Sequence, residues 1–243
     1  MRIIVVGSGM IGASVAYHVA VRGAEVTVVT GERPGGIATA ASFAWINAAP
    51  GNSRPYFEFR LKAILDWHRL QHELDGSLEM NWNGSLWWED DMEAVEEKTW
   101  ASTSWGYPMR VVSRAEAREQ EPSLRQPPDQ SVYSAIEGSV PPLQTAQLLL
   151  DRATARGAVI HIDTVLALTV DRGRVTGVRT PSGLIQADQV ILAAGEASEA
   201  LSADVGVVLP MANLGGFLAQ SVPRPPLLHG IVLAPRAHMR QCV

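Results

Sequence analysis

The sequence predicts an α/β fold, and three consecutive segments carry that prediction. Residues 3–6 are a continuous β-branched run, which is typical of a strand buried in a parallel sheet. A glycine-rich turn and a helical segment over residues 13–22 come next, and Gly23 stands where helices commonly end. Residues 26–29 are a second β-branched run. The stretch therefore forms one βαβ unit, the building element of a doubly wound sheet.

Composition excludes several classes of protein. The chain has 243 residues, of which 47% are hydrophobic, too many for a disordered chain. A formal net charge of −5, without a run of lysine or arginine, argues against nucleic acid or an anionic membrane as the main partner. The single cysteine, Cys242, excludes an internal disulfide and a structural zinc site. We expect no bound metal, no transmembrane segment and a cytoplasmic location, with peripheral membrane association as the alternative.

The rest of the chain alternates between predicted helices and strands. Helices are expected over residues 57–74, 91–100, 113–121 and 145–156, and strands over 77–88, 159–162, 165–170 and 190–192. Residues 174–179 and 184–186 are expected to form a hairpin, and residues 31–53 a long loop. Ser113 and Glu116 have the spacing of a capping box. All seven tryptophans lie between residues 45 and 105, and we expect most of them to be core.

Gly7, Gly9 and Gly12 form a Gly-x-Gly-x-x-Gly motif between the first predicted strand and helix. The first glycine allows a tight turn, the second lets a pyrophosphate approach the backbone, and the third lets the helix pack closely on the strand. The helix N-terminus, near Met10 and Ile11, offers free N–H groups to the phosphates. An ordinary glycine-rich turn is the alternative. The flanking strands and helix favour a dinucleotide site.

The end of the second predicted strand departs from the usual dinucleotide pattern. An acidic residue commonly holds the adenosine ribose there, whereas this sequence has Thr30. A threonine hydroxyl bonds the ribose without charge, and charge-assisted hydrogen bonds are roughly twice as strong. Glu32, two residues further on, is the second candidate for the ribose, and an exposed loop carboxylate is the equally weighted alternative for it.

Four later segments carry a resemblance to a known family. Residues 34–46, Pro-Gly-Gly-Ile-Ala-Thr-Ala-Ala-Ser-Phe-Ala-Trp-Ile, resemble the second flavin-contacting segment of the D-amino-acid oxidase-like FAD-dependent oxidoreductases. Glycine oxidase, sarcosine oxidase and D-amino-acid dehydrogenase belong to this family. Residues 137–142 are similar to the entry to its central helix, and residues 157–165 to its adenine-contacting strand. Residues 187–198 are similar to its Ala-Asp-x-Val-Val-x-Ala-x-Gly segment. The resemblance runs from residue 1 to about residue 240.

The resemblance implies a Rossmann-like FAD-binding domain with a discontinuous α+β substrate lobe, built on a mixed antiparallel sheet. We expect the FAD-binding domain to comprise residues 1–55 and 141–203, and the substrate lobe residues 56–140 and 204–243. Non-covalent FAD is expected, because no histidine occupies the 34–46 loop. The residues expected to bind it are Gly7, Gly9, Met10, Ile11, Gly12, Thr30, Glu32, Ala38, Thr39, Ala40, Ser42, Phe43, Ala44, Trp45, Val165, Ala194 and Gly195.

The implied activity is FAD-dependent oxidation of the C–N bond of an amino acid or secondary amine to an imine. The partner is then a small-molecule amine or amino acid, and no catalytic residue is assigned. Family members are longer, so we expect this chain to lack the C-terminal part that grips the substrate carboxylate. The late residues Arg236, Arg240, His229 and His238 are expected to be structural or exposed.

Three alternatives stay open. The first is a truncated or non-catalytic FAD-binding member of the family. The second is an NAD-dependent dehydrogenase, which needs only the first βαβ unit but leaves the 34–46 loop unexplained. The third is a related flavoprotein acting on a hydroxy acid or a modified tRNA base, and the absence of a basic patch disfavours its tRNA form.

Overall fold

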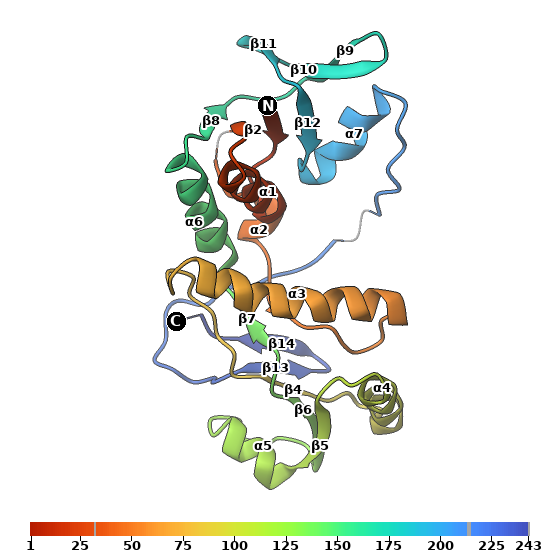
Figure 1. The fold of residues 1–243 in the computed structure, drawn as a ribbon. Helices are drawn as coiled ribbons and strands as arrows, with labels where there is room; N and C mark the ends of the chain where they lie inside the picture. Colours follow the sequence, from red (N-terminus) through yellow and green to blue (C-terminus); the bar gives the residue numbers. More distant parts are fainter. Residues whose placement is uncertain (32, 213–214, 243) are drawn as a thin grey trace. The chain divides into compact units, whose positions relative to one another are not determined.

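The computed structural model describes residues 1–31, 33–212 and 215–242 (Figure 1). The chain divides into two compact units. The first unit consists of Met1–Ser42 and Pro142–Leu218, and the second of Phe43–Pro141 and Ala219–Val243. Each unit is thus built from two separate stretches of sequence. The predicted α/β class is confirmed, while the assignment of cofactor and substrate to separate units stays a prediction.

A four-stranded parallel sheet forms the centre of the first unit. Its strand order is β12-β1-β2-β8, and all three pairings are parallel. The bounds are β1 Arg2–Val6, β2 Glu25–Thr30, β8 Val159–Ile162 and β12 Gln189–Leu192. Residues 3–6 of β1 are almost completely buried, as expected for a central strand covered on both faces.

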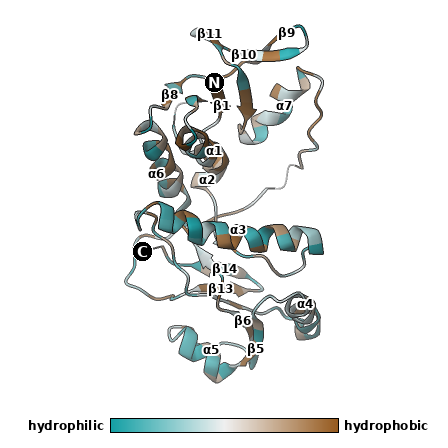
Figure 2. Cartoon of the chain, viewed as in Figure 1, coloured by the Kyte–Doolittle hydropathy of each residue, from teal (hydrophilic) through white to brown (hydrophobic). Residues whose placement is uncertain are grey.

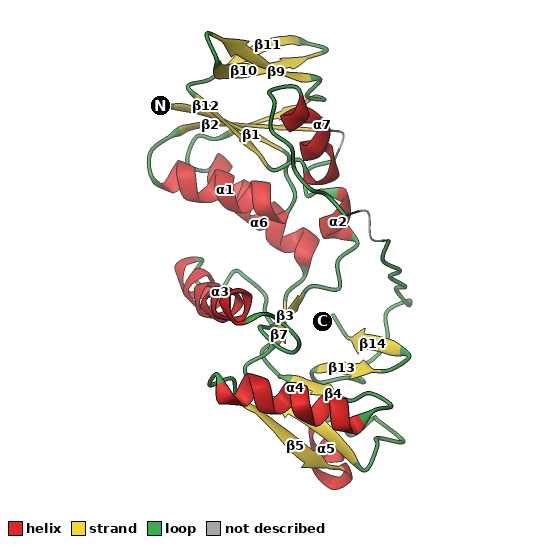
Figure 3. Ribbon diagram, turned by 90° about the vertical axis from the view of Figure 1, so that its right-hand side faces the viewer, coloured by secondary structure: helices red, strands yellow, loops and turns green. Residues whose placement is uncertain are grey.

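Helix α1 (Met10–Val21) connects β1 to β2 and packs beside α6 (Pro142–Thr154), as Figure 3 shows. The side of α1 that is buried carries small residues, Gly12, Ala13, Ala16 and Ala20, which allow close packing. Helix α1 is drawn mostly in brown in Figure 2, as expected of a helix covered on more than one side. Both helices begin three residues earlier than predicted, and α6 starts on a proline, a residue favoured at the first helical position.

The remainder of the first unit is an antiparallel sheet and three short helical segments. The sheet has the order β11-β10-β9, with β9 Ala167–Asp171, β10 Arg174–Thr180 and β11 Gly183–Gln186. The predicted hairpin is confirmed. The helical segments are α2 Ile37–Ala40, η1 Gly195–Ala197 and α7 Ser198–Ala203. One apolar cluster joins Ile4 and Val29 of the parallel sheet to Val178 of β10 and Leu201 of α7.

A five-stranded mixed sheet forms the centre of the second unit. Its order is β14-β13-β4-β6-β5. The bounds are β4 Ser85–Trp87, β5 Met109–Ser113, β6 Gln130–Ser134, β13 Ile231–Ala234 and β14 Ala237–Arg240. The β13–β4 pairing is parallel and the other three are antiparallel. The strands after residue 219 therefore complete a sheet begun near residue 85.

Three helices and a small ribbon complete the second unit. The helices are α3 Arg54–Glu73, α4 Met92–Ser104 and α5 Arg114–Gln120. The ribbon pairs β3 (Trp45–Ile46) with β7 (Gly138–Ser139) in antiparallel fashion. The predicted capping box is confirmed, because the Ser113 side chain accepts from the Glu116 N–H and the Glu116 carboxylate accepts from the Ser113 N–H.

Three sequence-based predictions are wrong in detail. Residues 77–88 contain only the short strand β4, because Gly84 has a left-handed backbone with φ +80° and the stretch before it turns. The 31–53 loop contains α2 and β3. Among the tryptophans only Trp87 is buried, and Trp100 is 73% exposed, so most are not core.

Candidate cofactor-binding site

The Gly7 turn lies at the carboxyl edge of the parallel sheet, where β1 and β12 end side by side. The Gly7 N–H donates to Val29 O (2.8 Å), and the Ala193 N–H donates to Val6 O (2.9 Å). Gly7 has φ +100°, and a Cβ on it would lie 2.3 Å from Ala193 O, so only glycine fits. The structure thus brings the glycine motif together with the Ala193–Ala194 segment, at the edge where α/β sheets bind ligands.

The second and third glycines of the motif permit close backbone approaches. A Cβ on Gly12 would lie 2.0 Å from Gly7 O, and a Cβ on Gly9 would lie 3.2 Å from Thr39 Oγ1. Gly36 approaches from the other side, because its own Cβ would lie 2.7 Å from Gly9 Cα. The loop before α2 therefore lies directly on the turn, and a side chain at Gly36 would clash with the main chain of Gly9.

The N-terminus of α1 presents backbone donors at the glycine turn. The Met10 N–H donates to Thr39 Oγ1 (2.9 Å), so one predicted cofactor residue binds another. Over the described ranges, the N–H groups of Ile11 and Gly12 have no hydrogen-bond partner. Free N–H groups at the positive end of a helix dipole favour an anion such as a phosphate. The residues present thus fit the pyrophosphate of a dinucleotide.

A buried hydroxyl pair closes the base of this turn. Ser8 Oγ and Thr30 Oγ1 lie 2.6 Å apart, and the Gly35 N–H donates to Ser8 Oγ (3.0 Å). Sequence reasoning did not assign a role to Ser8, although it stands inside the motif. Thr30 was expected to bind the ribose, and its hydroxyl is hydrogen-bonded to Ser8. Glu32, the second ribose candidate, lies outside the described residues, and the ribose contact stays a prediction for both.

The other predicted residues of the first unit differ in exposure. Ala38 and Ala40 are exposed on α2, while Thr39 and Ser42 are half-buried. Val165 and Ala194 pack against the apolar cluster that contains Ile4. The Ala194 N–H donates to Ser198 Oγ (3.1 Å), and Gly195 follows with φ +59°. Their contacts with FAD stay predictions.

Phe43, Ala44 and Trp45, also expected to bind FAD, belong to the second unit. Ala44 has φ +52°, a left-handed backbone that is uncommon outside glycine. Trp45 lies in β3 opposite Ser139, and its indole Nε1–H donates to Glu137 Oε2 (2.6 Å). The indole N–H is therefore already hydrogen-bonded within the protein.

Glu137 is the most buried carboxylate of the second unit, with 1% of its surface exposed. Its Oε2 also accepts from Ser85 Oγ (2.6 Å), and its Oε1 accepts from the Tyr107 hydroxyl (2.8 Å). Burial raises the pKa of Glu137 to about 7, against the opposing effect of these donors and of the Arg60 charge. Burial and the nearby carboxylate raise the pKa of Tyr107.

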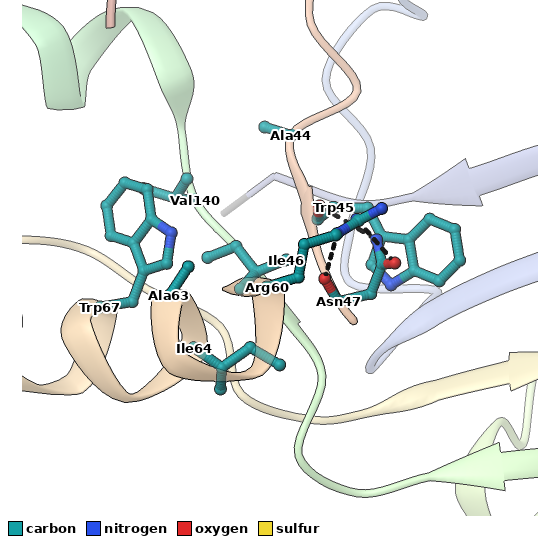
Figure 4. A pocket seen from close by; sticks show the side chains of 9 residues that line it. All are labelled: Ala44, Trp45, Ile46, Asn47, Arg60, Ala63, Ile64, Trp67 and Val140. Atoms are coloured by element: carbon teal, nitrogen blue, oxygen red, sulfur yellow. Dashed lines mark hydrogen bonds between the residues drawn. The ribbon is translucent and has the colours of Figure 1, made fainter. Parts of the chain in front are cut away.

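Arg60 of α3 holds the segment that follows Trp45. Its Nε donates to Asn47 O (2.9 Å) and its Nη2 to Asn47 Oδ1 (2.8 Å). These groups line a cavity of about 220 Å³, with Trp67 and Val140 towards one end and Trp45 towards the other (Figure 4). The remaining lining residues are Ala44, Ile46, Ala63 and Ile64.

The late residues of the second unit contact predicted site residues. The Arg240 guanidinium carbon lies 5.8 Å from the centroid of the Phe43 ring, a cation–π distance. The His238 ring centroid lies 6.2 Å from the same ring. His229, in contrast, donates its backbone N–H to Glu121 Oε2 (2.9 Å). Arg236 is exposed.

Two further properties concern metals and membranes. No group of three histidine, cysteine, aspartate or glutamate side chains in the described part of the chain has the arrangement of a metal site. None of the helices over the same ranges has the length and hydropathy needed to cross a membrane.

The parallel sheet, the glycine turn and the loop lying on it define a Rossmann-type protein of the class that binds dinucleotides. Residues 2–240 match the family described as FAD dependent oxidoreductase. The chain belongs to this family, and the resemblance seen in its motifs is confirmed.

Comparison with individual proteins finds several oxidoreductases that are similar to this chain. The chain is 29% identical over 256 residues to a glycine oxidase of Pseudomonas aeruginosa, covering 97% of this chain and 68% of that protein. It is 27% identical over 221 residues to the "Uncharacterized oxidoreductase YurR" of Bacillus subtilis, covering 84% of this chain and 57% of that one. The solved L-proline dehydrogenase from P. horikoshii shares the fold, with a TM-score of 0.82 at 19% identity over 99% of this chain and 67% of that one. The chain thus spans between 57% and 68% of these relatives' lengths.

Proposed function

We propose that the chain binds FAD non-covalently and belongs to an enzyme that oxidises the C–N bond of an amino acid or secondary amine to an imine. The observation that carries the proposal is the close approach of Gly36 and Thr39 to the Gly9 turn. Next to this contact, the N–H groups of Ile11 and Gly12, which have no partner among the described residues, are donors for a pyrophosphate.

The residues of this chain would bind and orient the cofactor. Ile11 and Gly12 would donate to the phosphates, and the Ser8–Thr30 pair would fix the loop at Gly35. FAD, when bound, supplies the acceptor for the hydride equivalent that leaves the substrate carbon. No side chain is proposed as a general base.

The names of two similar proteins support the proposed substrate class. One of them is a glycine oxidase and another an L-proline dehydrogenase, so a small amino acid or amine is proposed here. A cytoplasmic location is proposed from the single cysteine, which indicates a reducing compartment.

A visible absorbance spectrum tests cofactor binding directly. The purified full chain is mixed with FAD, and the excess is removed by gel filtration. Flavin absorbance bands that elute with the protein support FAD binding and exclude the NAD-dependent alternative. Acid precipitation then tests the mode of attachment, because non-covalent flavin is released into the supernatant. A folded but colourless protein would overturn the proposal.

Anaerobic titration with candidate amino acids and secondary amines tests the reaction. Loss of the flavin absorbance bands with substrate supports amine oxidation. Bound flavin that no candidate reduces would favour the non-catalytic FAD-binding alternative. Reduction by a hydroxy acid but by no amine would instead favour the third alternative.

A further inference from the structure

The 43–48 segment of the second unit is held by three separate side chains. Trp45 donates through its indole to Glu137. The Ala48 N–H donates to the Tyr107 hydroxyl (3.2 Å), which itself donates to Glu137. Arg60 binds Asn47 through two donors. Two of these three connections converge on a single carboxylate.

The backbone of Glu137 is itself fixed. Its carbonyl accepts from the Gly84 N–H (3.0 Å), and a Cβ on the following Gly138 would lie 2.4 Å from Asn81 O. Residues 138–139 pair with β3. The carboxylate therefore projects from a rigid point beside the segment that it contacts.

The donors around Glu137 come from distinct elements. Trp45 is in β3, Ser85 in β4, and Tyr107 lies before β5. The charged or titratable side chains that act on Glu137 from these surroundings are Tyr107 and Arg60. Burying a carboxylate costs free energy unless hydrogen-bond donors are already in place around it. Glu137 has three such donors, and its own backbone is fixed.

We propose that Glu137 is a positioning residue that holds the 43–48 segment, including the left-handed Ala44, in the conformation it needs for the FAD binding predicted for Phe43, Ala44 and Trp45. The proposal rests on the proposed function, because only FAD binding gives this segment a ligand. Glu137 would act through Trp45 and Tyr107 and not by touching the cofactor.

The first experiment uses the indole resonances of the full chain labelled with ¹⁵N-tryptophan. Trp45 is assigned by the resonance that Trp45→Phe removes. In the unsubstituted chain this resonance is expected to shift with pH, with a midpoint near 7, because the acceptor of the indole N–H titrates. Glu137→Gln should abolish that shift, because an amide keeps the shape but does not titrate.

A matched control and a second variant distinguish the titration of Glu137 from a general disturbance of the fold. Glu121 is another buried carboxylate of the same unit and accepts from the N–H groups of His229 and Gly230, so Glu121→Gln should leave the Trp45 titration unchanged. Ser85→Ala removes one donor to Glu137 and should move the midpoint to higher pH. This variant decides the matter if Glu137→Gln does not fold.

FAD affinity is the second readout. Glu137→Gln is expected to weaken FAD binding by about tenfold, as the loss of one charge-assisted hydrogen bond would, while Glu121→Gln should not. The proposal would be overturned if the Trp45 resonance had the same pH dependence in the unsubstituted chain, in Glu137→Gln and in Ser85→Ala. A changed resonance with unchanged FAD affinity would also overturn it. If the unsubstituted chain fails to bind FAD, the proposed function fails, and the resonance alone decides whether Glu137 holds Trp45.

Discussion

The hydroxyl oxygens of Ser8 and Thr30 lie 2.6 Å apart in the buried interior of the first unit. Ser8 also accepts from the Gly35 N–H, so one side chain links the glycine turn, the end of β2 and the loop before α2. Three segments of the first unit therefore meet at a single hydroxyl.

Replacing Ser8 by alanine tests this dependence. The change leaves the buried Thr30 hydroxyl and Gly35 N–H without this partner, and we expect a loss of about 1–3 kcal/mol in the free energy of unfolding. Urea denaturation measures it. The control is Thr164→Ala, which removes an exposed hydroxyl in the same unit. Equal midpoints for both variants would contradict the assignment.

Alanine substitutions separate the roles of the first two glycines. Gly7→Ala places a Cβ against a main-chain oxygen at left-handed φ, and we expect destabilisation of about 1–3 kcal/mol from backbone strain alone. The Cβ added by Gly9→Ala would lie 3.2 Å from Thr39 Oγ1 and 3.9 Å from Gly36 Cα, so the fold should survive while FAD affinity falls by about tenfold or more.

Thermal unfolding and FAD titration by fluorescence distinguish these two outcomes. Gly216→Ala is the control, because a Cβ there meets nothing within 4 Å. Undiminished FAD binding by Gly9→Ala would show that the cofactor phosphates lie elsewhere.

The raised pKa of Glu137 predicts a pH-dependent stability. The carboxyl has a pKa of about 7 in the folded chain against an ordinary value of 4.5, so the folded state binds more protons between these values. Its contribution to stability is complete below pH 4.5 and is lost as the pH rises through 7. The loss is on the order of 3 kcal/mol, measured as the difference between urea unfolding curves at pH 5 and pH 8. Glu137→Gln should remove most of this difference, and an unchanged pH dependence would refute the assignment.

Two substitutions of Arg60 separate its charge from its geometry. Lysine keeps the charge but does not reproduce the two-donor contact with Asn47, so Arg60→Lys should lose about 1–2 kcal/mol of stability. Arg60→Gln also removes the charge that lowers the pKa of Glu137. The pH midpoint of the Trp45 resonance should therefore rise with glutamine and stay near its original value with lysine. Identical midpoints would show that the Arg60 charge does not reach Glu137.

The first unit was predictable because its signals are local. A β-branched run, three glycines and a small-residue helix lie within one stretch of about 30 residues, the length of a βαβ unit, and β1, α1 and β2 form as expected. The mixed sheet of the second unit was less predictable. Its pairing of β13 with β4 joins residues 231–233 to 85–87, and no local pattern encodes a contact of that sequence separation.

The candidate site also has a part that local sequence predicts and a part that it does not. The glycine contacts follow from the motif, whereas the Ser8–Thr30–Gly35 contact could not be predicted, because it forms only when the loop is folded onto the turn. Glu137 belonged to a recognised motif, but its role depends on donors at positions 45, 85 and 107. Only the tertiary structure brings these positions together. A glutamate flanked by an isoleucine and a glycine carries no sequence signal for such a contact.

The parallel pairing of β13 with β4 has a consequence for biosynthesis. Strands β4, β5 and β6 leave the ribosome long before residues 231–240, so the nascent sheet presents the hydrogen-bonding edge of β4 without its neighbour. An open strand edge recruits other chains, and such intermediates aggregate readily. The interval between translation of β6 and of β13 is therefore the period in which a chaperone would protect this protein.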